Sequence, residues 1–342
     1  MRRFFVTGGA GFIGSAFVRL LLNEIPVCEI TNFDALTYAG NLDNLDGLDH
    51  GRHHFIKGDI ADRAAVSDAL VPDTEAIINF AAESHVDRSI VSADEFIRTN
   101  VLGTQVLLDC ARAHGVRRFV QISTDEVMGS LSEGDERAFF TEDSPFKPNS
   151  PYAASKAAAE HLVRAAHHTF GLDTVITRCG NNYGPRQFPE KFLPLMLANA
   201  MRDEAIPLYG DGQNVRDWIF VDDHCRAILL AMEKGRSAST YNIGARNERR
   251  NIDVIKSVLE KVGKPESLIK FVKDRPGHDR RYAIDPSLAE SELGWHPIET
   301  WETGLHQTIE WYKSNPEWVA RARSGAYREF YAQQYGIEAA TI

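Results

Sequence analysis

The sequence has few cysteines, no long apolar run and no excess of positive charge. Its four cysteines (Cys28, Cys110, Cys179 and Cys225) include no Cys-x-x-Cys pair, which favours reduced, mostly buried thiols in a cytoplasmic protein. No stretch approaches the roughly 20 apolar residues of a membrane span. The net charge of -10 argues against nucleic-acid binding, which needs a concentrated basic face. We therefore expect neither a nucleic-acid nor a membrane partner, whereas local Arg and Lys residues are compatible with an anionic small molecule.

Length and composition are those of an ordinary globular chain. The 342 residues predict one large or two modest domains, at about 100–200 residues per domain. The 43% hydrophobic and 25% charged residues are typical of a soluble protein. Basic and apolar residues begin the sequence (Met1–Val6), but glycines follow too soon for the apolar region of a signal peptide.

A glycine-rich loop follows the first apolar strand, Phe4–Val6. Gly8, Gly11 and Gly14 fit the dinucleotide fingerprint in its wider-spaced form, and a helix is expected over Ser15–Asn23. Glycines permit the tight turn and let backbone N–H groups at the helix N-terminus approach a pyrophosphate. The fingerprint alone is weak evidence, but the preceding strand and the following helix strengthen it.

An acidic residue stands at the distance that this fingerprint requires. Asp34 ends the second expected strand, Glu29–Phe33. Its carboxylate can accept hydrogen bonds from ribose hydroxyls and would repel a 2′-phosphate. The sequence therefore favours NAD over NADP.

Strands and helices continue to alternate in the first half of the chain. This order predicts an α/β fold with a doubly wound, Rossmann-type parallel sheet and right-handed crossovers. After the third strand, Gly58-Asp59-Ile60 could edge an adenine, and small residues after the fourth strand would let a flat cofactor lie close. The further strands are expected over His54–Lys57, Ala76–Phe80 and Phe119–Ile122, and a long helix over about Ala93–His114.

The stretch Ser123-Thr124-Asp125-Glu126 follows the apolar run Phe119–Ile122. An apolar run that stops at polar residues is typical of a buried parallel strand at its carboxyl end, where doubly wound sheets bind ligands. Two adjacent carboxyl groups repel, so one can stay protonated while the other ionises. This division suits a reaction that needs an acid and a base. On its own, however, the stretch is more typical of a helix cap or a turn.

A polar segment with three prolines, Leu131–Pro151, is expected to form a loop over the site. The helix after it carries Tyr152 and Lys156, which share one face at i and i+4. The ammonium would depress the phenol's usual pKa of about 10. A Tyr prepared in this way can take a proton from a sugar or alcohol hydroxyl.

Together these residues resemble the extended short-chain dehydrogenase/reductase family and, within it, the nucleotide-sugar 4,6-dehydratases. The most specific part is Thr124-Asp125-Glu126, because general family members lack the paired carboxyls. The similarity runs from residue 4 to about residue 300 and is carried by Thr7–Gly14, Phe33–Asn41, Ala81–Ser89, Ser123–Val127, Tyr152–Lys156, Asn181–Lys191 and Asp274–Tyr282.

The resemblance implies a redox-neutral dehydration of a nucleotide-diphosphate glucose, with dTDP-glucose as the expected substrate. Tyr152 would take the C4 hydroxyl proton while a hydride passes to tightly bound NAD+, and Thr124 would hydrogen-bond the same oxygen. Glu126 would then remove the C5 proton, and Asp125 would protonate the departing C6 hydroxyl. Return of the hydride to C6 gives a 4-keto-6-deoxy sugar. Lys156 would position the ribose and lower the pKa of Tyr152.

The resemblance also assigns residues to a cofactor set and a substrate set, and no metal site is predicted. Arg is suited to the diphosphate because it offers bidentate donors. The cofactor set is Gly8, Gly11, Phe12, Ile13, Gly14, Asp34, Ala35, Leu36, Thr37, Asp59, Ile60, Ala81, Ala82, Ser84, Thr99, Tyr152, Lys156 and Asn182. The substrate set is Ser84, His85, Thr124, Asn181, Glu190, Lys191, Phe192, Pro207, Tyr209, Arg216, Asn251, Arg275, His278 and Tyr282.

The second half is expected to add a smaller α/β substrate domain that is interleaved with the nucleotide half. A helix over Asp222–Lys234 would return to the nucleotide half, which then comprises residues 1–178 and about 214–240. The nucleotide-sugar domain would comprise about 179–213 and 241–325, and residues 326–342 would form a dispensable tail. A homodimer through the helices Ala93–His114 and Tyr152–Phe170 is a family expectation.

The sequence departs from the dehydratase pattern at three places. Met128 stands where Tyr is usual, Cys179-Gly180 where Thr-Ser is usual, and Arg186-Gln187 where an aromatic residue and His are usual. These changes concern rate and substrate fit more than the type of reaction. Two alternatives stay open: a nucleotide-sugar 4-epimerase or decarboxylase on the same scaffold, and a non-catalytic NAD-binding regulator.

Overall fold

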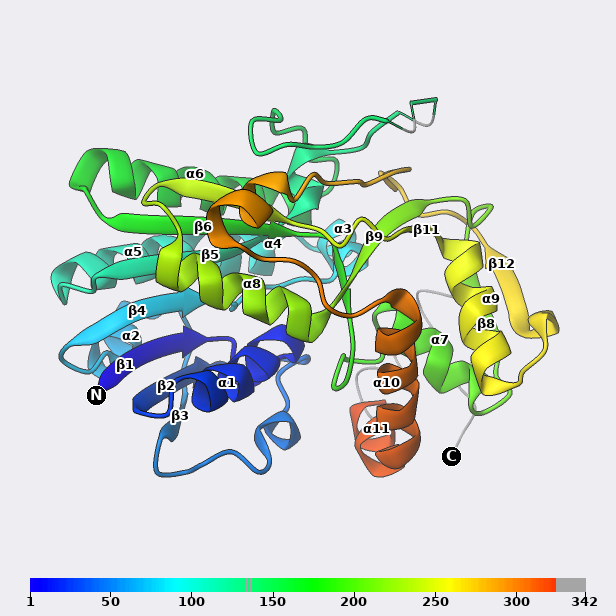
Figure 1. Ribbon diagram of the computed structural model, residues 1–342, viewed down its shortest axis with the longest axis horizontal. Coiled ribbons are helices and arrows are strands. Elements are labelled where there is room, and N and C mark those ends of the chain that lie inside the picture. Colours follow the sequence, from blue (N-terminus) through cyan, green and yellow to red (C-terminus); the bar gives the residue numbers. More distant parts are fainter. Residues whose placement is uncertain (133, 136, 324–342) are drawn as a thin grey trace.

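The structure is a computed structural model that describes residues 1–132, 134–135 and 137–323. At its centre, seven parallel strands pair in the order β10-β6-β5-β4-β1-β2-β3 (Figure 1). The order turns back between β1 and β4, and such a switch point opens a crevice at the carboxyl ends of the strands. The doubly wound parallel sheet predicted from the sequence is confirmed. The strands are β1 (Arg2–Thr7), β2 (Cys28–Asp34), β3 (His53–Lys57), β4 (Thr74–Asn79), β5 (Arg118–Thr124), β6 (Asp173–Cys179) and β10 (Ser239–Ile243).

Helices cover both faces of this sheet because successive side chains along a strand point to opposite faces. Phe4 and Val6 of β1 share one core with α1 and α8, whereas Phe5 shares the other with α2, α5 and α6. The chain therefore forms three layers. The helices are α1 (Phe12–Glu24), α2 (Arg63–Ala69), α3 (Val86–Val91), α4 (Asp94–Phe96), the π segment η2 (Ile97–Gly103), α5 (Thr104–Ala113), α6 (Pro151–Phe170) and α8 (Val221–Lys234).

The long helix expected over about Ala93–His114 is present, but a π segment interrupts it between α4 and α5. This segment carries the buried Asn100. The Asn100 amide accepts from the Glu83 N–H (2.9 Å) and donates to the Glu83 carbonyl (3.0 Å) and to the Ser155 hydroxyl (2.8 Å). Through these bonds the π segment connects Glu83, after β4, to Ser155 of α6. Such π turns recur at functional sites.

The second half of the chain builds a smaller lobe next to the carboxyl ends of the strands (Figure 1). Its sheets are ordered β11-β9-β7 and β12-β8, and rings of Tyr183, Trp218 and Trp301 pack at its centre. The elements of this lobe are β7 (Asn181–Tyr183), α7 (Phe192–Ala200), β8 (Ile206–Tyr209), β9 (Val215–Phe220), β11 (Glu248–Arg250), α9 (Asn251–Val262), η4 (Glu266–Leu268), β12 (Ile269–Val272), α10 (Trp301–Ser314) and α11 (Pro316–Ala322). Two short helices belong to the main lobe: η1 (Leu42–Leu45), and η5 (Ala289–Leu293), which packs against α8 and β10.

The chain passes between the lobes more than once. β9 pairs with β7 and β11 in the smaller lobe, whereas β10 pairs with β6 at the edge of the main sheet. Between these strands, α8 packs on the main sheet with β1 and α1. The turn-rich break expected at Asn181–Pro185 begins with a short strand, because Asn181–Tyr183 pairs with Trp218–Phe220. The tail expected at 326–342 lies outside the described residues.

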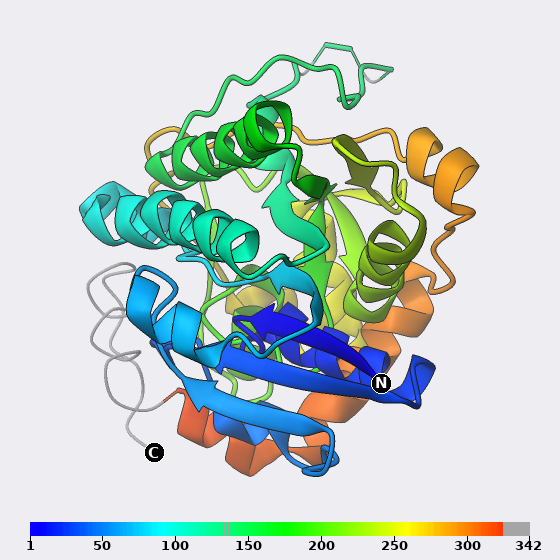
Figure 2. The same ribbon diagram turned by 90° about the vertical axis from the view of Figure 1, so that its left-hand side faces the viewer.

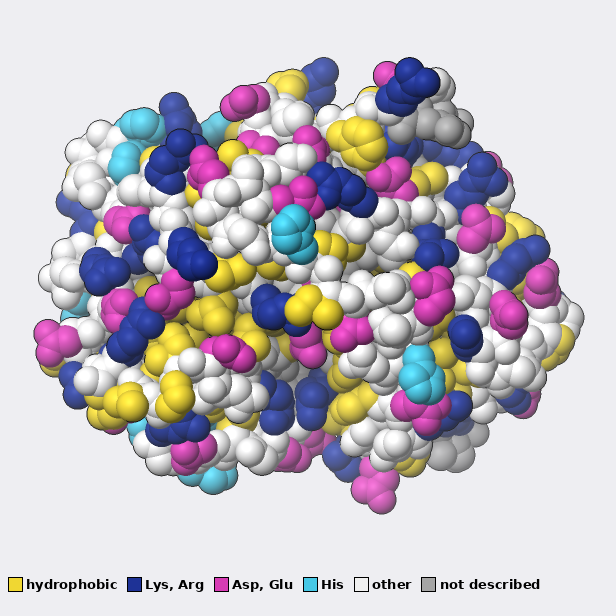
Figure 3. Space-filling view, viewed as in Figure 1, with side chains coloured by type: hydrophobic (Ala, Val, Ile, Leu, Met, Phe, Trp, Pro, Cys, Tyr) yellow, Lys and Arg dark blue, Asp and Glu magenta, His cyan; other side chains and the backbone are white. Residues whose placement is uncertain are grey.

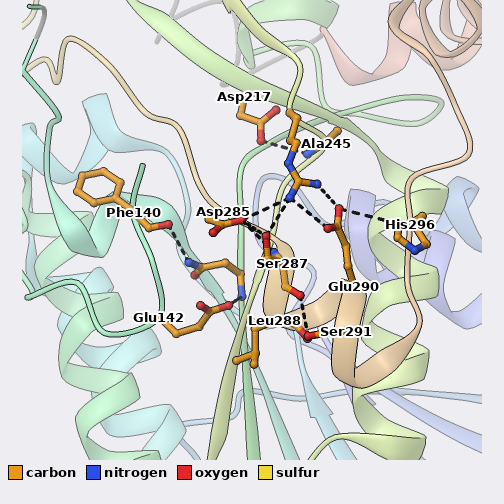
Figure 4. A network of polar contacts seen from close by, with 12 residues as sticks. Phe140, Glu142, Asp217, Ala245, Asp285, Ser287, Leu288, Glu290, Ser291 and His296 are labelled. Carbon is orange, nitrogen blue, oxygen red and sulfur yellow. Dashed lines mark hydrogen bonds and ion pairs between the residues drawn. The ribbon is translucent and has the colours of Figure 1, made fainter. Parts of the chain in front are cut away.

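The described residues of Leu131–Pro151 do not line the cleft, so the prediction of a loop over the site is wrong for them. Phe140 bridges to Ile284, and Glu142 accepts from the Asn242 N–H of β10 (2.9 Å). Figure 4 shows Phe140 and Glu142 at this edge of the sheet. The apolar side chains of the segment pack against residues 282–284, which holds the segment on the outside of the main lobe.

The charge distribution on the surface and the state of the cysteines are those expected from the composition. Positive and negative side chains are interspersed on the face shown in Figure 3. Within the described residues, none of the helices has the length and apolar character that crossing a membrane requires. All four cysteines are buried and unpaired.

Candidate active site

A cavity of about 460 Å³ lies between the carboxyl ends of the strands and the smaller lobe. Its lining runs from the glycine loop, past the ends of β2, β4, β5 and β6, to the segment 275–282. Every residue that the sequence analysis assigned to the site lines this cleft except Leu36. The Leu36 side chain packs instead against the core of β1 and α1, because the turn after β2 directs it inward. None of the described residues of Leu131–Pro151 lines the cleft.

Glycines shape the loop at the first end of the cleft. Gly8 has a left-handed φ of 69°, and a Cβ on Gly14 would lie 2.2 Å from the Gly8 carbonyl oxygen. The loop thus closes tightly onto the first turn of α1, where the N-cap residue Gly11 contributes no side chain. A pyrophosphate fits here because the N–H groups and the dipole of a helix N-terminus attract negative charge.

Asp34 ends β2 beside this loop, as the sequence predicts. Its Oδ2 accepts from the Ala10 N–H (2.9 Å) and its Oδ1 from the Leu36 N–H (2.8 Å). Burial raises the pKa of Asp34, and the two backbone hydrogen bonds oppose this shift. Each oxygen keeps a second lone pair, so the carboxylate can accept ribose hydroxyls while it fixes the loop. The expected neighbours of the cofactor also line this part: Ala35, Thr37, Asp59, Ile60, Ala81, Ala82 and Thr99.

The residues after β5 turn into the cleft. Thr124 caps the short 3-10 helix η3 (Asp125–Met128): its Oγ1 accepts from the Glu126 N–H (3.3 Å) and donates to Asp125 Oδ1 (3.3 Å). The sequence left a helix cap and a ligand-facing site as alternatives, and the structure contains both. Asp125 Oδ2 is buried and has no hydrogen-bond partner among the described residues.

Asp125 and Glu126 differ in their electrostatic surroundings. Burial and the adjacent charge of Glu126 raise the pKa of Asp125 well above its usual value. Burial also raises the pKa of Glu126, but three cations of the smaller lobe oppose this shift, namely Arg275, Arg216 and Lys191. The pKa of Asp125 is therefore raised more strongly than that of Glu126, which is the order that a division into acid and base needs.

Tyr152 and Lys156 lie on the face of α6 that lines the cleft. The hydroxyls of Tyr152 and Thr124 are hydrogen-bonded, but burial and the Glu126 charge raise the pKa of Tyr152 well above 10. Lys156 donates to the Ile122 carbonyl (2.6 Å), and burial lowers its pKa to about 8. The pKa of Tyr152 is therefore raised and not lowered as expected from Lys156, because burial and the negative charge of Glu126 both disfavour the phenolate.

Cations of the smaller lobe converge on the other end of the cleft. Arg216 donates to the Asp279 carbonyl (2.7 Å), Arg275 pairs with Asp87 (3.2 Å), and Lys191 donates to a backbone carbonyl of the main lobe (2.5 Å). This end therefore suits a diphosphate. The other expected substrate residues line the same cleft: Ser84, His85, Asn181, Glu190, Phe192, Pro207, Tyr209, Asn251, His278 and Tyr282.

The sequence analysis missed Asp87, which lines the cleft on α3. It accepts from the Tyr209 hydroxyl (2.9 Å) and from Arg275 (3.2 Å), so it orients two groups of the smaller lobe. No spacing in the sequence relates Asp87 to partners more than 100 residues away.

The sequence analysis also missed a buried ion pair behind the site. Glu160 of α6 accepts from the Ser123 hydroxyl (2.5 Å) and pairs with Arg178 of β6 (2.8 Å). Glu160 stands four residues after Lys156, and this helical spacing was a usable signal. Among the described residues, no cluster of His, Cys, Asp or Glu is arranged to hold a metal ion.

The arrangement defines a class of enzyme. A doubly wound sheet whose crevice holds a glycine loop, an acid at the end of β2 and a Tyr-x-x-x-Lys helix is the architecture of the extended short-chain dehydrogenase/reductases that the sequence resembles. More particularly, the chain belongs to the GDP-mannose 4,6 dehydratase family, whose sequence model matches residues 5–308.

Individual relatives agree with this assignment. The chain is 49% identical over 348 residues to the dTDP-glucose 4,6-dehydratase of Xanthomonas campestris pv. campestris (strain B100), covering 96% of this chain and 98% of that protein. DesIV, a dTDP-glucose 4,6-dehydratase from Streptomyces venezuelae solved with NAD and TYD bound, is 48% identical with a TM-score of 0.90, covering 94% of this chain and 99% of DesIV. The UDP-glucose 4-epimerase of Thermotoga maritima, solved with UDP-glucose, is 29% identical with a TM-score of 0.85, covering 92% and 99%. The predicted resemblance to nucleotide-sugar 4,6-dehydratases is confirmed.

Proposed function

We propose that the protein is a hydro-lyase that dehydrates dTDP-glucose to the 4-keto-6-deoxy sugar with NAD as cofactor. The observation that carries this proposal is the pair Asp125 and Glu126 next to the hydroxyls of Thr124 and Tyr152. Elimination of water needs an acid for the departing hydroxyl and a base for the proton. Epimerisation at C4 has no use for such a pair.

The glycine loop and Asp34 fit NAD. The loop is too tight for a Cβ at Gly14, so it brings the start of α1 close to a pyrophosphate. The Asp34 carboxylate suits unphosphorylated ribose hydroxyls and repels a 2′-phosphate, while Lys156 is placed to hold the second ribose. When bound, NAD supplies the temporary removal and the return of one hydride, so the overall reaction is redox-neutral.

Tyr152 and Thr124 act at C4 of the glucose. Because their hydroxyls are hydrogen-bonded to each other, both can reach one substrate oxygen. Tyr152 takes the C4 hydroxyl proton as the carbonyl forms, and Thr124 donates a hydrogen bond to that oxygen. Thr124 keeps its place because it also caps η3.

Glu126 and Asp125 carry out the elimination. The 4-ketone makes the C5 proton acidic, and Glu126 removes it. Asp125 Oδ2, which bonds to none of the described residues, donates its proton to the C6 oxygen, and water leaves. Burial raises the pKa of both groups, but cations oppose the shift only at Glu126 to a marked degree, which suits Asp125 as the acid and Glu126 as the base.

The nucleotide is held by the smaller lobe. Arg216 and Arg275 supply bidentate donors for the diphosphate, and Asp87 fixes Arg275 in the cleft. We assign residues 179–220 and 244–323 to substrate binding and residues 1–178 and 221–243 mainly to NAD binding. The dTDP-specific relatives at 47–49% identity support thymine as the base.

We further propose a cytoplasmic homodimer. The four unpaired cysteines suit a reducing compartment. The helical layer of α3, η2 and α6 exposes large apolar side chains, including Val91, Ile97, Leu102 and Phe170, and Figure 2 shows α5 and α6 side by side on this flank. Such side chains favour burial against a second copy.

The product of dTDP-glucose tests the proposal. Purified protein should yield a product that is lighter by one water, detected by mass spectrometry, and should turn over UDP-glucose much more slowly. An unchanged mass with a galacto-configured product would instead establish a 4-epimerase. An absence of turnover together with NAD binding would favour the regulator.

A further inference from the structure

The C-terminal helix α11 reaches across to the glycine loop of the main lobe. The Trp318 indole N–H donates to Asn44 Oδ1 (3.0 Å), and Asn44 Nδ2 donates to the Ala10 carbonyl (2.9 Å). All three residues are buried. Figure 2 shows the orange-red C-terminal helices next to the blue N-terminal part of the chain. A continuous chain of two hydrogen bonds therefore joins α11 to the loop that faces the dinucleotide.

Ala10 is the point at which this loop is held. Its N–H donates to Asp34 Oδ2 (2.9 Å), and its carbonyl accepts from Asn44 and from the Asn41 N–H (3.1 Å). Glycines flank Ala10 on both sides, and glycine backbone is conformationally permissive. Contacts from outside the loop, rather than the loop's own side chains, therefore fix its conformation.

A second connection leads from α10 to the opposite end of the cofactor site. The Tyr312 hydroxyl donates to the Gln187 carbonyl, and Gln187 Nε2 donates to the Asn182 carbonyl (2.9 Å). Asn182 lines the cleft with Tyr152. The Asn182 side chain is fixed in turn by His224 Nδ1 (2.9 Å).

Both connections start from one cluster of three rings. Trp318, Tyr312 and Trp311 pack with centroid distances of 5.0–6.2 Å. Trp311 belongs to the same cluster, but its indole makes no hydrogen bond among the described residues. The cluster thus offers two residues that reach the cofactor site through hydrogen bonds and one, Trp311, whose ring instead lies under the Arg186 guanidinium (5.4 Å to the centroid), a contact that a Phe ring can keep.

We propose that Trp318 and Tyr312 are positioning residues for the dinucleotide, and that the C-terminal helices brace its site at both ends. Trp318 acts through Asn44 on the pyrophosphate loop, and Tyr312 acts through Gln187 on Asn182 at the reactive end. This inference rests on the proposed use of NAD. It predicts that the smaller lobe sets the affinity for a cofactor that the main lobe contacts.

The test compares single-group deletions within the cluster. Trp318→Phe and Tyr312→Phe remove the donors and keep an aromatic ring, and Trp311→Phe is the matched control. Asn44→Asp keeps the acceptor for Trp318 but removes the donor to Ala10. Each protein is stripped of nucleotide, and the NAD dissociation constant and the NAD-induced rise in melting temperature are measured.

Trp318→Phe and Tyr312→Phe should each weaken NAD binding about tenfold, because Asn44 and Gln187 each lose a buried partner and then hold Ala10 and Asn182 less firmly. Asn44→Asp should match or exceed Trp318→Phe, and Trp311→Phe should stay within about twofold of the parent protein. The NAD-induced rise in melting temperature should shrink in the first three variants.

A purely structural role would lower the melting temperature with and without NAD alike and leave the dissociation constant unchanged. That outcome, or equal NAD affinities for Trp318→Phe, Tyr312→Phe and Trp311→Phe, overturns the inference. Failure of the unaltered protein to bind NAD refutes the proposed function instead, so the two failures are distinguishable.

Discussion

Asp125 and Glu126 are consecutive residues whose carboxyl groups meet different surroundings. Asp125 has a buried oxygen without a partner among the described residues, whereas Glu126 is under the influence of Arg275, Arg216 and Lys191. The backbone contributes to this difference, because β5 ends at Thr124 and both residues lie in the first turn of η3. The chemistry therefore depends on a turn geometry as much as on the residue types.

Replacing Glu126 by Gln should stop turnover after oxidation at C4. The amide cannot take the C5 proton, so kcat should fall by about a thousandfold, within the usual range for loss of a general base. C4 oxidation should persist, and reduced nicotinamide should accumulate in a single-turnover absorbance measurement. Full turnover by Glu126→Gln would show that another group is the base.

Lys156 should set the alkaline limb of the pH profile. Burial lowers its pKa to about 8, so the ammonium is present below this pH and is lost as the pH rises through it. Because the charged form is expected to hold the ribose, kcat/KM should decline above about pH 8. In Lys156→Arg the guanidinium stays charged, and the limb should move to higher pH. If the alkaline limb stays near pH 8 in Lys156→Arg, a group other than Lys156 is responsible for it.

At the scale of an element, the glycine loop and α1 act as one unit. A Cβ at Gly14 would lie 2.2 Å from the Gly8 carbonyl oxygen, whereas one at Gly134 would meet nothing within 4 Å. Gly14→Ala should therefore weaken NAD binding by about a hundredfold, as the loop opens away from the helix N-terminus. Gly134→Ala should bind NAD like the parent protein in the same titration. Similar affinities for both variants would contradict the assigned role of the loop.

The ion pair between Glu160 and Arg178 connects α6 to β6. Glu160 and Arg178 are both buried and hydrogen-bonded through several atoms. Glu160→Gln should cost about 3–5 kcal/mol in the free energy of unfolding, because it leaves a buried guanidinium uncompensated. The double variant Glu160→Leu with Arg178→Met should recover much of this loss in urea titrations. Equal destabilisation of the single and double variants would show that the pair is not coupled.

At the scale of the whole molecule, the flank of α3, η2 and α6 should form the dimer interface. Ile97 and Leu102 are 51% and 50% exposed on this flank, and Phe271 and Ile298 are 62% and 71% exposed elsewhere. Ile97→Glu with Leu102→Glu should give monomers in size-exclusion chromatography with light scattering, since buried charge opposes association. Phe271→Glu with Ile298→Glu should leave the dimer intact. Dissociation by the second pair alone would place the interface on the other surface.

Local sequence patterns predicted most of the main sheet, and the residues that the resemblance assigned to the site all line the cleft except Leu36. Apolar runs followed by glycine, Asp34 or the Thr124–Glu126 stretch mark where strands end, and parallel strand ends meet at one edge. Leu36 was misplaced because the motif gives its position but not the inward direction of its side chain. The Leu131–Pro151 segment was predicted to be a loop over the site because most of its residues are polar. Its Phe140 instead packs against residues far along the chain.

The pKa shifts and the long-range ion pairs could not be predicted from the sequence. Spacing alone suggested that Lys156 would lower the pKa of Tyr152, but burial dominates for both groups. Asp87 and Arg178 have partners that only the folded chain brings near. Long-range pairing and desolvation are properties of the assembled lobes, and motifs do not encode them locally.

The late return of the chain to the main sheet has a consequence during synthesis. β6 has no neighbour on its outer side until β10, which ends at Ile243, has left the ribosome. At about 5–20 residues per second, the nascent protein carries an open strand edge for several seconds, and such an edge is a template for aggregation. Pauses in translation between residues 179 and 243 should therefore lower the yield of folded enzyme more than pauses elsewhere.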